Sequence, residues 1–487
     1  MVTFTVLNLS LHMNANLEQL RGGRSTGGGA LPDRAWRRFA HAAGRPVDGS
    51  SLAVFRIVFG LVTLLSAVRL LRNGWADSLY GAPTHHLRYS GLGWVPTWSS
   101  SAVRVLVVVI AVAAVGVVLG AWTRCSAVVL WSAFSWMELT EASVYLNHYW
   151  FVTLAGLLLV VLPVSGCWSL DARRRGRAVR VPVGAVWWVR AQVGIVYCFA
   201  GVAKLHGDWL ARGLPLSLWL PARSDLPVVG ELLTFRSTAL VLSWAGALFD
   251  CTVVLFLLWR RTRPWAWTAV VAFHLATWVL FPIIGVFPWL MIGASTIFFD
   301  PDWPRRLLAR VRGRPGDAAG ATAAGVTWRP LHGAVVVIAG CWLLVQVVLP
   351  MRHLLYPGDH RWTGEGYRFG WNVLLVEKAG DVVFRVTDTT TGLTWRTDAG
   401  GLFTPTQWRT MAVEPELIRQ AAHAVAARAA EQHHVPVERI EVRADAFVSF
   451  NGRAAQRLVD PQVDLAAEPW RLGHQPWILP VPTSDPP

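Results

Sequence analysis

The chain has 487 residues, of which 53% are hydrophobic and only 15% are charged, and its mean hydropathy is +0.39. This composition excludes an ordinary soluble protein and predicts a membrane protein. The net charge of +15 does not indicate nucleic-acid binding, because the basic residues lie between long apolar runs and not on one water-soluble face.

The first fifty residues contain a Gly-rich patch at 22–30 and arginines up to Arg45. They lack the charged start, long apolar stretch and small-residue cleavage site of a signal peptide. We therefore predict a mostly disordered cytoplasmic tail over residues 1–50.

Nine apolar segments follow, and a segment needs roughly 20 residues to cross a bilayer. The third is short, and only Phe281-Pro282 divides the seventh from the eighth, so eight or ten spans remain open. We predict about nine transmembrane helices in a domain over residues 51–350. The segments are 52–71, 103–121, 126–137, 149–164, 186–205, 239–258, 265–281, 283–299 and 331–349.

Arginine clusters precede the first predicted span and follow the fourth, sixth and eighth spans. Because cytoplasmic connections of membrane proteins are enriched in Arg and Lys, these connections are expected to lie in the cytoplasm. The N-terminus is then cytoplasmic, and the region after nine spans lies outside the cell membrane. The clusters include Arg37, Arg38, Arg173, Arg174, Arg175, Arg260, Arg261, Arg305 and Arg306.

From about Met351 the composition changes. Residues 381–386 and 440–449 alternate apolar and polar side chains, which is typical of strands, whereas the Ala-rich segment 415–431 is helical in character. We predict a β-rich α+β extracytoplasmic domain over residues 351–487. The five cysteines stand singly without a ligand spacing, so neither a metal site nor a disulfide framework is expected.

The most informative basic residue is Lys204, at the outer end of the fifth predicted span. Of the 45 basic residues, 43 are arginines, and only Lys204 and Lys378 are lysines. A membrane-surface anchor could equally be an arginine, but only lysine can lose its proton when it is buried. We therefore interpret Lys204 as a general base.

Two histidines lie in predicted spans near the same site. His148 begins the fourth span at the depth of Lys204, so the two side chains could face one another, and Asn147 could orient His148. His274 lies within the seventh span. Considered alone, it is more typical of a hydrogen-bonded core histidine, but near Lys204 and His148 it becomes a candidate third member of the site.

These residues stand in motifs that resemble the vitamin K-dependent γ-glutamyl carboxylase family, within the wider HTTM membrane-domain group. The resemblance covers roughly residues 50–465, in both the membrane part and the soluble part. Its motifs are 52–60 (LAVFRIVFG), Asn147-His148, 168–171 (WSLD), 190–192 (RAQ), 195–205 (IVYCFAGVAKL), Asp208-Trp209, Phe273-His274, 302–305 (DWPR), Leu349-Pro350, His353, Trp362-Thr363, Tyr367, Trp371, Phe403-Thr404 and 459–464 (VDPQVD).

The resemblance implies an enzyme that couples oxidation of reduced vitamin K by O2, to the epoxide, with proton removal from a glutamyl γ-carbon and addition of CO2. The quinol would be phylloquinol or menaquinol. By the same resemblance Lys204 is the catalytic base, assisted by Asn147 and His148. Quinone-binding positions are Tyr197, His274, Phe287 and Met291, and glutamate-binding positions are Trp362, Tyr367 and Lys378.

The expected setting is a bacterial-type enzyme in the cell membrane that acts on a glutamate-containing peptide or protein, together with a quinone-epoxide reductase as a possible partner. The chain departs from the family pattern at Val376, Lys378 and Thr406-Gln407-Trp408. These departures put recognition of a propeptide-bearing protein substrate in question. Two alternatives remain: a membrane quinol epoxidase without protein carboxylation, and a non-enzymatic HTTM partner such as an immunity protein.

Overall fold

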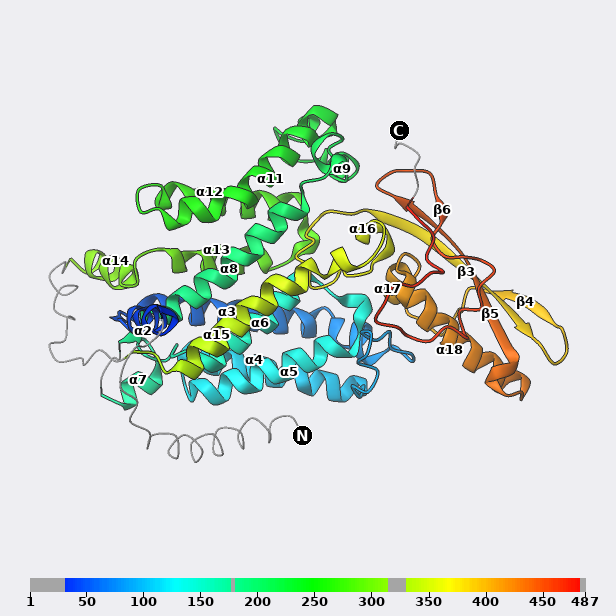
Figure 1. Ribbon diagram of the computed structural model, residues 1–487, viewed down its shortest axis with the longest axis horizontal. Helices are drawn as coiled ribbons and strands as arrows, with labels where there is room; N and C mark the ends of the chain where they lie inside the picture. The colour runs from blue at the N-terminus through cyan, green and yellow to red at the C-terminus, as the bar shows by residue number, and fades with distance from the viewer. Residues whose placement is uncertain (1–30, 177–179, 314–329, 482–487) are drawn as a thin grey trace.

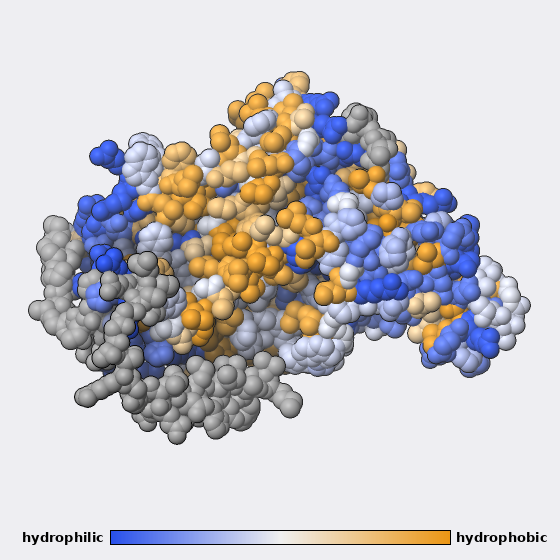
Figure 2. Space-filling view, in the orientation of Figure 1, coloured by the Kyte–Doolittle hydropathy of each residue, from blue (hydrophilic) through white to orange (hydrophobic). Residues whose placement is uncertain are grey.

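The computed structural model describes residues 31–176, 180–313 and 330–481, and it divides into a helical bundle and a smaller α+β domain (Figure 1). The α+β domain lies at one end of the bundle. Apolar side chains gather on the visible surface of the bundle, and hydrophilic side chains cover most of the α+β domain (Figure 2). This distribution is the one expected of a membrane domain joined to a soluble domain.

Each segment predicted as a span overlaps a helix, and within lipid a helix satisfies the backbone hydrogen bonds of a single segment. Glycines allow some of these helices to approach closely: a Cβ at Gly201 would lie 2.7 Å from the backbone nitrogen of Cys251. The helices are α3 (Ser50–Arg72), α4 (Ser100–Leu119), α5 (Thr123–Thr140), α6 (Asn147–Val161), α8 (Val183–Ala203), α11 (Arg236–Leu258), α12 (Arg263–Leu280), α13 (Phe287–Ser295) and α15 (Gly333–Met351).

Length and composition identify five candidate membrane spans in the described part of the chain. These are α3, α4, α8, α11 and α15, the last extended to Leu355 by the 3-10 turn at Arg352–Leu355. Helix α6 and the segment Phe287–Phe298 are apolar but shorter. The structure therefore supports a multi-span domain, and the total of nine spans stays a prediction.

The eighth predicted span, 283–299, is not one continuous helix. A 3-10 turn occupies Pro282–Ile284, Gly285 has a φ of 68°, and α13 has only nine residues. At 1.5 Å per residue α13 is roughly 14 Å long, about half of the hydrocarbon thickness. Pro282 and Gly285 interrupt the helix, and the non-helical turn lies against a cavity, where such backbone is tolerated.

Short elements complete the helical region. The predicted tail carries α2 (Leu31–Ala43) and β1 (Pro46–Val47), so residues 31–47 are not disordered as predicted; residues 1–30 lie outside the described residues. Strand β1 pairs antiparallel with β2 (Val181–Pro182). The other short elements are α7 (Leu170–Arg174), α9 (Gly207–Leu210), α10 (Leu216–Trp219) and α14 (Trp303–Val311).

The arginine-rich connections lie at one end of the bundle. Helices α2, α7 and α14 occupy the end that faces away from the α+β domain (Figure 1). At that end Arg260, Arg263 and Arg306 share the carboxylate of Asp300. The arginine-rich connections, which are separate from the C-terminal domain in the sequence, are thus also far from it in space.

The C-terminal domain has a four-stranded antiparallel sheet in the order β4-β3-β5-β6, with α18 packed on β5 and β3. The predicted strands 381–386 and 440–449 and the predicted helix 415–431 are confirmed as parts of β3, β5 and α18. The elements are α16 (His360–Thr363), β3 (Lys378–Asp388), β4 (Thr394–Thr397), α17 (Pro405–Met411), α18 (Pro415–His433), β5 (Ile440–Phe450) and β6 (Gln456–Arg457).

Candidate functional site at the junction of the two domains

Lys204 caps the C-terminus of α8 and is 4% exposed. Its Nζ donates hydrogen bonds to the backbone oxygen of Ala200, at 3.1 Å, and to Oδ2 of Asp250, at 2.8 Å. The Trp209 ring centroid lies 5.3 Å from the same Nζ. The lysine is therefore buried with a carboxylate partner and is not a side chain extended toward the membrane surface.

Asp250 was missed by the sequence reasoning, although a carboxylate within an apolar helix is a signal of function. It stands near the middle of α11, is 4% exposed, and forms its ion pair with the lysine on α8. The close approach of the two helices at Gly201 and Cys251 makes this contact possible. The acid in the sixth predicted span could have been found from its position alone.

Tyr197 and His274 meet in the core of the bundle. The hydroxyl of Tyr197 lies 2.9 Å from Nε2 of His274 and 3.4 Å from the hydroxyl of Ser295. Ser295 in turn donates to the backbone oxygen of Met291, at 2.6 Å. Helices α8, α12 and α13 thus contribute to one buried polar cluster, and Ser295 is a member that the sequence did not indicate.

His148 and Phe287 line a cavity between α3, α4, α5, α6 and α13. Their rings stack with centroids 5.3 Å apart and an interplanar angle of 27°. The rest of the lining is mostly apolar, with Arg69, Tyr149, Thr63 and Ser66 as polar members. An apolar cavity with a few converging polar groups is the kind of site that binds a largely apolar small molecule.

Lys204 and His148 have different partners. The rings in contact with His148 are those of Tyr149 and Phe287, and over residues 31–176, 180–313 and 330–481 no hydrogen bond joins His148 to Lys204. Lys204, Tyr197 and His274 are also not among the residues that line the cavity. The prediction that Lys204 and His148 belong to one site remains untested.

Asn147 connects the bundle to the C-terminal domain. Its Nδ2 donates to the backbone oxygen of Asn372, at 2.9 Å, and its Oδ1 accepts from the hydroxyl of Tyr145, at 3.0 Å. The same hydroxyl accepts from the backbone nitrogen of Phe369, at 2.7 Å. Asn147 is therefore bonded to the loop between α16 and β3, and not to His148.

The three predicted glutamate-binding residues lie around this loop. Nζ of Lys378 donates to the backbone oxygens of Trp362, at 2.7 Å, and Val413, at 3.3 Å. The hydroxyl of Tyr367 lies 3.5 Å from the backbone oxygen of Asn372. Burial lowers the pKa of Lys378 and raises the pKa of Tyr367, because a charged form is costly away from water.

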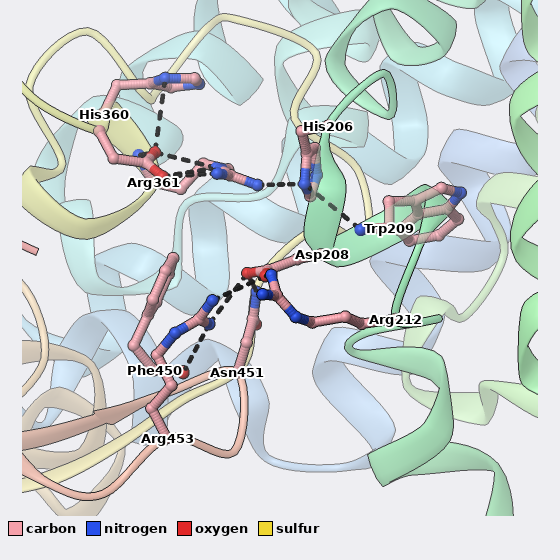
Figure 3. A network of polar contacts seen from close by, with 10 residues as sticks. His206, Asp208, Trp209, Arg212, His360, Arg361, Phe450, Asn451 and Arg453 are labelled. Atoms are coloured by element: carbon pink, nitrogen blue, oxygen red, sulfur yellow. Dashed lines mark hydrogen bonds and ion pairs between the residues drawn. The ribbon is translucent and has the colours of Figure 1, made fainter. Parts of the chain in front are cut away.

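A polar network joins the segment after Lys204 to the C-terminal domain (Figure 3). Asp208 pairs with Arg453, at 2.7 Å, and Arg212, at 3.1 Å, and accepts from Asn451 Nδ2 at 3.0 Å. Asn451 in turn accepts from the backbone nitrogen of Glu377, the residue before Lys378. The network therefore connects the chain segments that carry the two lysines.

His206 occupies a second part of this network. Its Nδ1 accepts from the backbone nitrogen of Trp209, at 3.4 Å, and contacts the Arg361 guanidinium, which pairs with Asp359 (Figure 3). Burial, reinforced by the charge of Arg361, lowers the pKa of His206 to about 4. Despite its burial, Asp208 has a pKa well below its usual range, because Arg453 and Asn451 bond to its charged form. The junction holds a neutral imidazole and an ionised carboxylate.

Within the part of the chain that the structure describes, no group of three or more His, Cys, Asp or Glu side chains is arranged to hold a metal ion.

Fold and site together define a multi-pass membrane protein with a lumenal-type C-terminal domain. The family model described as the HTTM domain matches residues 44–303, and the model described as the lumenal domain of vitamin K-dependent gamma-carboxylase matches residues 331–484. No solved structure gave a significant match. The chain belongs to the vitamin K-dependent gamma-carboxylase family.

Proposed function

We propose that this protein is an integral membrane vitamin K-dependent γ-glutamyl carboxylase. The observation that carries the proposal is the penetration of the loop after α16 into the bundle. Trp371 of this loop is fully buried and packs in the hydrophobic core of the membrane helices. A glutamyl group held by the C-terminal domain would therefore lie beside the residues of the membrane helices that this loop contacts.

In this proposal the cavity beside His148 and Phe287 receives the quinol from the bilayer. Tyr197, His274 and Met291 belong to the neighbouring polar cluster, and Lys204 accepts a proton from a quinol hydroxyl. The reduced vitamin K supplies, on reaction with O2, the driving force for removing the weakly acidic glutamyl γ-proton. Burial of the site keeps water from competing for that proton.

The glutamyl side chain is proposed to bind at Lys378, Trp362 and Tyr367. The hydrogen-bond partners of Lys378 among the described residues are two backbone carbonyl oxygens, and the carboxylates of Glu414 and Asp359 act on it only through their charge. A carboxylate is the group that would neutralise this charge most strongly. This supports a substrate carboxylate beside Lys378, with CO2 adding to the γ-carbon and the peptide approaching from outside the membrane.

The position of the arginine-rich connections supports a cytoplasmic N-terminus and an extracytoplasmic C-terminal domain. We keep the division into residues 1–50, 51–350 and 351–487 as part of the proposal. A quinone-epoxide reductase would regenerate the quinol, and the glutamyl substrate would be a peptide or protein outside the cell membrane.

The test uses purified protein with reduced vitamin K, O2, labelled bicarbonate and a Glu-containing peptide. We expect labelled peptide and quinone epoxide from the wild type, and loss of both in Lys204→Ala. Leu205→Ala is the matched control, because the neighbouring Leu205 is 56% exposed on the outside of the bundle. Wild type that matches Lys204→Ala in both products would refute the proposal.

The same assay separates the two alternatives. Epoxide without labelled peptide indicates a membrane quinol epoxidase, which the cavity at His148 alone could support. A cellular phenotype that survives replacement of both Lys204 and His148 indicates a non-enzymatic HTTM partner.

A further inference from the structure

The ion pair between Lys204 and Asp250 is almost completely enclosed. The two side chains are 6% and 5% exposed, and their nearest polar atoms are 2.8 Å apart. The other neighbours of the ammonium are the Ala200 carbonyl oxygen and the Trp209 ring. No second carboxylate bonds to this ammonium in the described part of the chain, so Asp250 is its counter-ion.

The titratable groups that face this pair come from two helices. Tyr197 and Cys198 lie on α8, and Cys251 follows Asp250 on α11. From α9 the pair meets only the uncharged Trp209 ring. A phenol and two thiols carry no charge at neutral pH in their ordinary forms. The electrostatics of the site are therefore dominated by Lys204 and Asp250 themselves.

A buried pair of this kind favours one proton shared between its two members. With no proton, a carboxylate would be buried alone, and with two protons, an ammonium would be buried alone; both states are costly in a low-dielectric interior. With one proton the pair is neutral overall, as an ion pair or as an amine beside a carboxylic acid. Two such groups titrate as a unit and not as independent residues.

We propose that Lys204 and Asp250 act as a single base, in which Asp250 is a positioning residue that takes up the ammonium proton and leaves the amine free. This inference rests on the proposed function. Lys204 takes a proton from a quinol hydroxyl: the O–H bond breaks and an N–H bond forms. The pair passes from one proton to two, and its added positive charge balances the negative charge left on the quinol oxygen.

The proposal changes how Lys204 responds to pH. A lone buried lysine yields its amine by releasing a proton to solvent, so below its pKa the free-amine fraction rises about tenfold per pH unit. In the pair the proton moves only to Asp250, and the free-amine fraction stays constant while the pair holds one proton. In Asp250→Asn the free-amine fraction of Lys204 should therefore rise with pH, as for a lone lysine. In Asp250→Glu, which retains a carboxylate, it should stay constant.

The rate of reductive methylation measures the free amine directly and needs no turnover. Formaldehyde with a borane reductant is applied to wild type, Asp250→Asn and Asp250→Glu between about pH 6 and 9, and methylation is followed by mass spectrometry. Because the chain has only two lysines, Lys378 serves as the internal reference. Comparing the variants at each pH cancels the pH dependence of the reagent.

We expect the Lys204 rate in Asp250→Asn, divided by the wild-type rate, to rise with pH by up to about tenfold per unit. The same ratio for Asp250→Glu should remain constant, as should both ratios for Lys378. A Lys204 ratio for Asp250→Asn that is independent of pH, whatever its size, overturns the proposal, because a purely structural role for Asp250 would change the rate without changing its pH dependence.

A second measurement covers the case in which Asp250→Asn does not fold, shown by a Lys378 rate equal to that of denatured protein. The Lys204 rate in native wild type is then divided by its rate in the denatured wild-type chain. A quotient that falls by about tenfold per pH unit over the whole range supports the pair, and a quotient that is constant at the acidic end of the range, as for a lone lysine below its pKa, overturns it. Epoxide formation, measured in parallel, keeps the two proposals separate. A result that supports the Lys204–Asp250 pair without epoxide refutes only the proposed function. Epoxide together with a Lys204 that titrates independently of Asp250 refutes only the pair.

Discussion

Of the two lysines of this chain, Lys204 is buried and Lys378 is half-buried, and their hydrogen-bond partners differ. Lys204 meets the carboxylate of Asp250, whereas Lys378 meets the backbone oxygens of Trp362 and Val413. The scarcity of lysine was enough to single out both residues from the sequence. Their partners were not predictable, because they come from segments 46, 16 and 35 residues away along the chain.

His206 illustrates how a single buried residue can give the protein a pH-dependent stability. The pKa of His206 is lowered to about 4 in the folded protein, against about 6.5 for an unperturbed histidine. Between these values the unfolded chain binds a proton that the folded protein does not. The contribution of His206 to stability is therefore complete above about pH 6.5 and is lost as pH falls toward 4.

We predict that His206→Asn makes stability less sensitive to acid. The Asn side-chain oxygen can replace Nδ1 as the acceptor at the start of α9, because Asn is a favourable residue for capping a helix N-terminus, but it does not titrate. The midpoint of thermal unfolding should fall less between pH 7 and 5 than in wild type. His434→Asn, at an exposed position, should behave as wild type, and parallel falls in all three proteins would contradict the prediction.

At the scale of elements, the loop between α16 and β3 determines how the domains meet. Phe369, Trp371 and Leu374 all have positive φ angles, between 56° and 60°, a region that bulky side chains rarely adopt. Such a conformation persists only where the surroundings hold it in place. Here Trp371 packs among the membrane helices, and Phe369 stacks edge-on against Tyr145, with centroids 5.1 Å apart.

We predict that Trp371→Ala lowers the free energy of unfolding by about 3–5 kcal/mol, because it removes a fully buried aromatic side chain from this core. Trp371→Phe should cost less, since the Phe ring fills part of the space and the Trp371 indole nitrogen has no hydrogen-bond partner among the described residues. Thermal or denaturant unfolding in detergent measures both. Trp94→Ala, at a position 68% exposed, is the control, and an equal loss in that variant would argue against the prediction.

The positions of these elements were only partly predictable. The strands at 381–386 and 440–449 and the helix at 415–431 follow from local periodicity, and α18 and β5 confirm it. The predicted span at 283–299 was wrong as a continuous helix, because Pro282 and Gly285 break it beside the cavity. Apolar composition alone cannot distinguish a full span from a shorter helix that follows a turn.

At the scale of the whole molecule, the attachment of the C-terminal domain depends on buried charge. Asp208 and Arg453 are 4% and 10% exposed in their side chains and lie on opposite sides of the junction. Removing one partner of a buried ion pair leaves the other without compensation. The pair therefore couples the stability of the two domains.

We predict that Asp208→Asn destabilises the protein by about 3 kcal/mol, because the buried Arg453 guanidinium loses its carboxylate. The double variant Asp208→Asn with Arg453→Gln should be less destabilised than the sum of the single variants. Unfolding midpoints, together with proteolysis at the junction, measure the effect. Additive losses would show that the two side chains act independently and would contradict this account of domain attachment.

The sequence by itself determined that this is a multi-pass membrane protein with a C-terminal α+β domain, and its motifs indicated the family. Those properties follow from local patterns of apolar and charged residues. Only the tertiary structure decided that Lys204 pairs with Asp250, that Asn147 bonds to a loop of the other domain, and that Asp208 is paired with Arg453. These contacts join distant segments whose approach depends on the packing of whole helices, which local sequence patterns do not specify.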